Sequence, residues 1–177
     1  MTRARVAVAL AAALTALLLQ ATVIGPIASP VPVSLPAVLI AAVALVDGPG
    51  AGMAFGFSAG LLADLASTHP AGVLALCWTG VGIGCGLAAG RRSVRRDAAT
   101  AAIMCAVAAS AATLLLAVVS SGGATAWLAV RDLVPTGIGD ALLALAVVPL
   151  VLAFLSTDSL RAAQPAMTEL SFGGRRG

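Results

Sequence analysis

The chain has 177 residues, of which 60% are hydrophobic and only 10% are charged, with a formal net charge of +3. Soluble domains are typically about 45–50% apolar and about 25% charged, so this chain has too little charge to cover a water-facing surface. The composition excludes a soluble globular enzyme and a disordered chain, and the apolar runs lack the alternation of a barrel strand. The sequence therefore predicts an all-α, polytopic integral membrane helical bundle.

The first apolar run covers residues 6–27 and follows Arg3 and Arg5. As a helix it is roughly 33 Å long, which is enough to cross a bilayer. A cleaved signal peptide is the rival interpretation. The run is longer than an ordinary signal core and has no clean small-x-small cleavage site, so we expect a first membrane span.

Two short apolar segments come next, at residues 35–46 and 51–66. Four prolines in Gly25–Pro36 predict a stiff, extended connection before them, because proline fixes φ and lacks the backbone donor. Asp47–Gly50 predicts a tight turn between them. Each segment falls short of a bilayer's hydrocarbon thickness of about 30 Å, so the pair forms either two short, buried spans or a re-entrant hairpin.

Three longer runs complete the predicted set of six spans. A compact charged loop at Arg91–Asp97 and a polar joint at Ser121–Asp132 separate them. The polar segment 156–177 is predicted to be a flexible cytoplasmic tail. The three longer spans are residues 72–90, 98–120 and 133–155.

The arginines fix the predicted orientation, since the chain contains no lysine. With six spans and the N-terminus inside, only Arg131 lies outside. Because cytoplasmic loops carry the excess of basic residues, this distribution predicts that both chain ends are cytoplasmic. The cytoplasmic arginines are then Arg3, Arg5, Arg91, Arg92, Arg95, Arg96, Arg161, Arg175 and Arg176.

Glycines recur every four residues in two of the predicted spans. Positions four apart form one ridge of a helix, and glycine there lets another helix backbone come close. We therefore expect spans 51–66 and 72–90 to pack tightly, either against each other or against a partner. The candidate helix-docking residues are Gly52, Gly56, Gly60, Asp64, Gly82, Gly86 and Asp140, and Gly48 and Gly90 continue the two ridges.

The two acids in this set are Asp64 and Asp140, which lie inside predicted spans on the same side of the membrane. An ionisable group there is costly and usually faces the bundle or a cavity. Asp64 is close to its helix end, where the turn Ser67–His69 could leave it solvated at the interface. Asp140 lies roughly 10 Å deep and suits a structural hydrogen bond inside the bundle. Arg131 is the nearest basic residue and could pair with either acid.

Catalytic and metal-binding patterns are missing from the sequence. His69 is the single histidine, and Cys77, Cys85 and Cys105 all lie inside apolar runs without a Cys-x-x-Cys pair. No Gly-x-Ser-x-Gly, His-Glu-x-x-His or phosphate-binding loop is present. We therefore expect no enzymatic activity, no cofactor and no metal. The absence of an aromatic-interleaved basic groove also argues against nucleic acid.

One stretch resembles a known family. Gly56–Leu65 reads Gly-Phe-Ser-Ala-Gly-Leu-Leu-Ala-Asp-Leu, and after a short turn Gly72 opens a long span. This pattern is similar to the bacterial rod shape-determining membrane protein MreD, as are the chain length and the stretch Pro135–Leu143. Two positions depart from the family. Pro36-Ala37 stands where Pro-Asp is frequent, and Asp140 where Asn is frequent, which puts in doubt any polar contact assigned to them.

The resemblance implies a non-catalytic subunit of the lateral cell-wall elongation machinery, located in the bacterial inner membrane. It also implies partners: the single-pass protein MreC and, through it, filament-forming MreB, the glycosyltransferase RodA and a class B penicillin-binding protein. The bilayer itself is the remaining expected partner.

Two other functions are alternatives for a small helical membrane protein. The vitamin-binding S components of energy-coupling-factor transporters are also six-span chains of this size. A chain with no Tyr, no Asn and only two Trp offers few groups for such a pocket. A proton-coupled channel would use Asp64 and Asp140, but two acids on one side do not make a relay across the membrane.

Overall fold

The computed structural model describes residues 3–24, 33–67, 72–89, 93–121 and 126–155. Within these residues the chain forms six α-helices, and the first of them ends in a short π-helix. This result confirms the predicted all-α bundle. The elements are α1 (Arg3–Leu19), η1 (Gln20–Ile24), α3 (Leu35–Asp47), α4 (Pro49–Leu65), α5 (Val73–Ala88), α6 (Val94–Ser121) and α7 (Ala126–Leu155).

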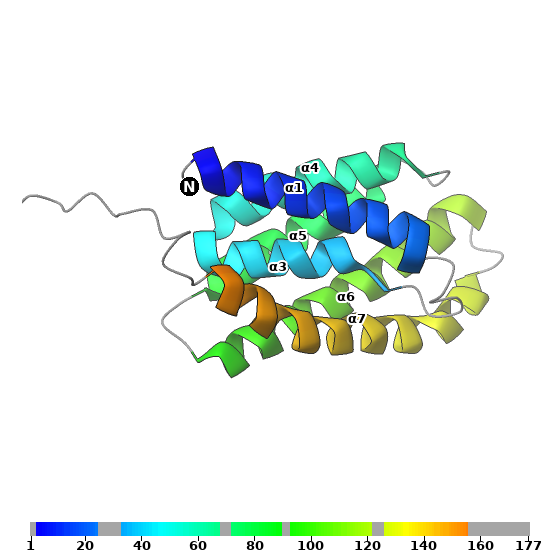
Figure 1. The fold of residues 1–177 in the computed structure, drawn as a ribbon. Helices are drawn as coiled ribbons and strands as arrows, with labels where there is room; N and C mark the ends of the chain where they lie inside the picture. The colour runs from blue at the N-terminus through cyan, green and yellow to red at the C-terminus, as the bar shows by residue number, and fades with distance from the viewer. Residues whose placement is uncertain (1–2, 25–32, 68–71, 90–92, 122–125, 156–177) are drawn as a thin grey trace, which may run out of the picture.

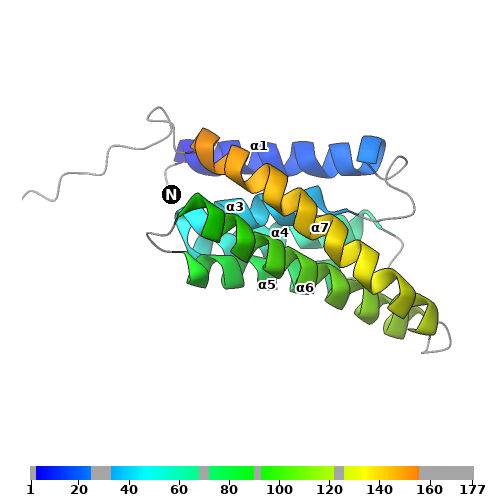
Figure 2. The same cartoon turned by 90° about the horizontal axis from the view of Figure 1, so that it is seen from below.

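Successive helices run in opposite directions along the bundle, so the beginning of α1 and the end of α7 lie at the same end (Figure 1). Helix α4 packs along α5, and α6 packs along α7. Helix α3 contacts all five of the other α-helices and so forms the centre of the bundle. Figure 2 shows α1 set apart from α5 and α6, and its helix contacts are with α3 and, less extensively, α4.

The central position of α3 follows from its length and composition. Its 13 residues span about 20 Å, which is too short to cross a bilayer of about 30 Å unaided. Its small apolar side chains let neighbours approach closely, and Val38, Ala41 and Ala44 are fully buried. The structure thus places the two short segments in antiparallel helices that both run along the bundle, and protein surrounds the shorter one.

The exterior of the bundle is apolar. Val94–Val119 of α6 and Val130–Ala153 of α7 are long and apolar enough to cross a membrane, and shorter apolar helices accompany them. Large side chains such as Leu76, Leu87 and Leu150 are at least two-thirds exposed. Exposed apolar surface on this scale suits a hydrocarbon solvent rather than water.

The loop predicted at Arg91–Asp97 and the polar joint predicted at Ser121–Asp132 are wrong at their ends, because charged residues continue the helices there. Helix α6 already begins at Val94, and the N–H groups of Arg96 and Asp97 donate to the Ser93 carbonyl oxygen. Helix α7 begins at Ala126, so Arg131 lies in a helix rather than in a polar joint. An α-helix continues past the hydrocarbon edge when its charged side chains reach the polar headgroup layer.

The prediction of an extended connection at Gly25–Pro36 is also wrong for its last two residues, which are helical. Helix α3 begins at Leu35, with Pro36 in its first turn, where the missing N–H has no intrahelical partner to lose. Residues 25–32 and the predicted tail 156–177 lie outside the described residues.

Two glycines make the turns that the hairpins need. Gly48 alone separates α3 from α4 and has φ +87°, and Gly72 precedes α5 with φ +102°. A residue with a Cβ is strained in this region, whereas glycine is not. The tight turn predicted at Asp47–Gly50 therefore centres on Gly48, and the residues on either side of it are helical.

Candidate functional site

The glycine ridges of α4 and α5 face each other. We call their five glycines, Gly52, Gly56, Gly60, Gly82 and Gly86, the glycine seam. On the α4 side, a Cβ added at Gly52 would lie within 3.0 Å of the Gly82 backbone. A Cβ at Gly56 would meet the backbone of Trp78, and one at Gly60 would meet the backbone of Ala75.

The α5 side of the seam is equally tight. A Cβ at Gly82 would meet the Gly52 carbonyl group, and one at Gly86 would meet the backbone of Pro49. Each seam glycine therefore occupies a place where backbone lies against backbone, as in close membrane helix pairs. The sequence left open whether these ridges pack on each other or on a partner, and the structure places them on each other. Gly90 lies outside the described residues.

Asp64 continues the α4 ridge and caps α5. Its carboxylate accepts hydrogen bonds from the backbone N–H of Gly72 at 2.8 Å, of Leu74 at 3.1 Å and of Ala75 at 3.0 Å. The first N–H groups of a helix have no intrahelical acceptor, and the helix dipole favours a negative charge there. Gly72 itself has no capping side chain, so an acid from the preceding helix supplies the cap.

The solvated interfacial position considered for Asp64 is wrong, since only 2% of the residue is exposed. The reason is the close approach of α5. Its first turn lies directly over the end of α4, because the seam glycines allow the two backbones to meet.

Asp140 of α7 holds the beginning of α3. Its Oδ1 accepts a hydrogen bond of 2.6 Å from the backbone N–H of Ser34, and the residue is 2% exposed. The side chain of Gln20 in η1 also binds the backbone at the beginning of α3. Its Oε1 accepts from the Leu35 N–H at 3.0 Å, and its Nε2 donates to the Val33 carbonyl oxygen.

Arg131, the expected counter-ion, is exposed. The partners found for the two acids are backbone N–H groups instead, and for Asp140 this is the structural hydrogen bond that the sequence suggested.

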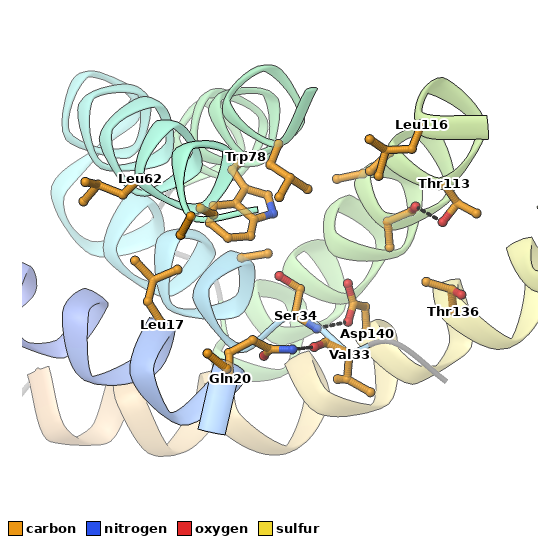
Figure 3. Close-up of a pocket in the computed structure, with 18 of the residues that line it drawn as sticks. Leu17, Gln20, Val33, Ser34, Leu62, Trp78, Thr113, Leu116, Thr136 and Asp140 are labelled. Atoms are coloured by element: carbon orange, nitrogen blue, oxygen red, sulfur yellow. Dashed lines mark hydrogen bonds between the residues drawn. The ribbon is translucent and has the colours of Figure 1, made fainter. Parts of the chain in front are cut away.

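A cavity of about 720 Å³ lies beside this contact. We call it the Asp140 cavity. Its floor is formed by Ser34 and Asp140, and the indole of Trp78 lies across from them (Figure 3). Leucines from α1 and α4 and the last turns of α6 close the sides, with Leu17, Leu62 and Leu116 among them. The cavity is thus mostly apolar, with polar groups gathered at one place.

Two hydroxyl groups at this cavity are unpaired within the described residues. Ser34 Oγ and Thr136 Oγ1 are both buried and have no hydrogen-bond partner there. Thr136 lies one helical turn before Asp140 and is 5% exposed. Sequence reasoning missed Gln20, Ser34 and Thr136. Gln20 was detectable as the single amide side chain inside the first apolar run.

The contacts of the glycine seam, Asp64 and Asp140 all hold helices of the bundle together. The described residues contain no group of three His, Cys, Asp or Glu side chains that could hold a metal ion. The cysteines among them, Cys77, Cys85 and Cys105, are buried.

Comparison with known proteins gives one clear result. The family model described as rod shape-determining protein MreD matches residues 3–157, which include all six helices. No curated protein and no solved structure matches the chain. The chain therefore belongs to the MreD family of rod shape-determining proteins, non-catalytic multi-pass proteins of the cytoplasmic membrane that act in cell elongation.

Proposed function

We propose that this protein serves cell elongation as a docking subunit. It binds the transmembrane helix of an MreC-type single-pass protein and thereby gathers a RodA-type glycosyltransferase and a class B penicillin-binding protein. The observation that carries this proposal is the family match over residues 3–157. The geometry agrees with it, since the buried acids Asp64 and Asp140 accept backbone hydrogen bonds that hold the bundle together.

The docking surface is the outer face of α4 rather than the glycine seam. The seam is covered by the chain's own helices, which leaves no room for a partner there. A second line of small residues, Gly50, Ala54 and Ser58, recurs at the same four-residue spacing and is exposed. Small residues at this spacing let a second membrane helix approach closely.

The test compares matched substitutions in co-purification with an MreC-type partner from the same membrane. Ala54→Leu and Ser58→Leu enlarge side chains on the proposed surface, and we expect each to weaken partner binding about tenfold, equivalent to about 1.4 kcal/mol, and so to lower partner recovery. Ala99→Leu, at an exposed position of α6, makes the same change elsewhere and should leave recovery unchanged.

Two controls make the result decisive. The variants should match the parent in membrane yield and in thermal stability, because the substituted positions are exposed. Full partner recovery with Ala54→Leu and Ser58→Leu together would move the docking site away from α4. Failure of the unsubstituted protein to recover the partner would overturn the docking role itself.

A further inference from the structure

The polar floor of the Asp140 cavity is chemically incomplete. Asp140 is the single ionisable side chain among the described residues that line the cavity. It has one backbone donor, from Ser34, and no cationic side chain among the described residues approaches it. A carboxylate buried without a positive partner is unfavourable in a membrane interior.

Two further acceptors belong to residues that line the same cavity. Ser34 adjoins the Asp140 carboxylate through the 2.6 Å backbone contact, and Thr136 lies one turn earlier on α7. Both hydroxyl oxygens are buried and unpaired in the described part of the chain. Buried polar groups without partners are rare, and each calls for an explanation such as a bound molecule.

The rest of the cavity is apolar and of suitable size for a small molecule. Its volume of about 720 Å³ falls in the range of about 300–1,000 Å³ that is common for ligand pockets. Aliphatic side chains from α1, α4 and α6 supply most of the wall, and the Trp78 ring lies opposite the polar floor (Figure 3).

We propose that the Asp140 cavity binds an organic amine that carries one apolar tail. A protonated primary amine supplies the positive charge that Asp140 lacks, and its N–H groups can donate to the carboxylate and to an acceptor next to it. Its charge neutralises Asp140, and its tail fills the aliphatic part of the cavity. An acyl chain alone would leave the Asp140 carboxylate without a counter-ion, and an anion would be repelled by it.

The experiment uses the full chain in phosphatidylcholine nanodiscs with octylamine, octanol and octanoate as matched probes. Trp127→Phe leaves Trp78 as the single tryptophan, so its fluorescence reports on the cavity. We expect saturable binding of octylamine, binding of octanol at least about tenfold weaker because it has no charge-assisted hydrogen bond, and none of octanoate.

Three variants locate the site. Asp140→Asn removes the charge but keeps an oxygen that accepts from Ser34, so the fold should persist while octylamine affinity falls about tenfold or more. Thr136→Val removes a hydroxyl that has no partner among the described residues, and it should lower the affinity for octylamine several-fold. Asp132→Asn removes an exposed acid of the same helix and should change nothing.

Circular dichroism and thermal melting of each variant check that any loss of binding occurs in a folded protein. Equal affinity for the three probes, or unchanged octylamine affinity in folded Asp140→Asn, would overturn the proposal. Lysophosphatidylethanolamine, which has an amine headgroup and one acyl chain, distinguishes two sources of the amine. Competition with octylamine would identify a lipid headgroup as the occupant, and unimpeded octylamine binding would identify a free amine.

Discussion

The two halves of this bundle use the same kind of residue in opposite ways. In the α4–α5 hairpin, Asp64 accepts three backbone hydrogen bonds and the glycine seam brings the helices into backbone contact. On the side formed by α1, α3 and α7, Asp140 has one backbone donor and lines a cavity of about 720 Å³. Both acids are 2% exposed, so burial alone does not distinguish them.

The number of backbone hydrogen bonds that each carboxylate accepts is what distinguishes the two acids. Three donors fix Asp64 within the fold, whereas Asp140 has one and forms part of the proposed binding site. The family-like stretch Gly56–Leu65 supplies two of the five seam glycines and the acid that caps α5. Asp140 of α7 instead shares the beginning of α3 with Gln20 and lines a cavity with Ser34 and Thr136, whose hydroxyls have no partner among the described residues. Four predictions probe this contrast: three single-site changes in descending order of expected effect, then the non-additivity of a seam pair.

The largest loss of unfolding free energy is expected when a side chain is placed in the glycine seam between α4 and α5. Gly56→Leu places a side chain where Trp78 backbone already lies, so α4 and α5 must separate. We expect a loss of about 3 kcal/mol in unfolding free energy, measured by SDS titration in mixed micelles with circular dichroism. Gly80→Leu is the matched control, because nothing lies within 4 Å of a Cβ there. Equal losses in the two variants would contradict a closed seam.

Smaller losses of unfolding free energy are expected when either acid is replaced by alanine, and they should differ between the two acids. Asp64→Ala removes the acceptor of three backbone N–H groups and should lower the unfolding free energy by about 3 kcal/mol or somewhat less. Asp140→Ala loses one hydrogen bond but also removes a buried charge, so we expect the unfolding free energy to fall by only about 1 kcal/mol. The same titration measures both, with exposed Asp132→Ala as the baseline. A larger loss for Asp140 than for Asp64 would reverse the comparison.

The smallest effect has the opposite sign. Thr136→Val replaces an unpaired buried hydroxyl by a methyl group of similar shape, and we expect a gain of about 1 kcal/mol in unfolding free energy. Thr79→Val should give no gain, because the Thr79 hydroxyl donates to the Ala75 carbonyl oxygen. Destabilisation by Thr136→Val in the ligand-free protein would show that its hydroxyl has a partner.

Sequence reasoning reached the helical class, the six helices and both glycine ridges, because hydropathy and four-residue spacing are local properties. It did not reach the cap that Asp64 provides or the role of Gln20, because both depend on which helix ends meet in space. The boundaries at Val94 and Ala126 were missed for a different reason. Charge marks the edge of the hydrocarbon layer, whereas a helix ends only where its hydrogen bonding ends.

The central claim is that the glycines of α4 and α5 are each other's partners, and a double-mutant cycle on Gly52 and Gly82 tests it most directly. Gly52→Ala and Gly82→Ala should each destabilise the protein. The loss of unfolding free energy in the double variant should be smaller than the sum of the two single losses by at least about 1 kcal/mol. The reason is that helices already forced apart by one Cβ do not clash with the second. The exposed pair Gly50→Ala and Gly80→Ala should be additive. Additivity at Gly52 and Gly82, or two silent single variants, would contradict the account.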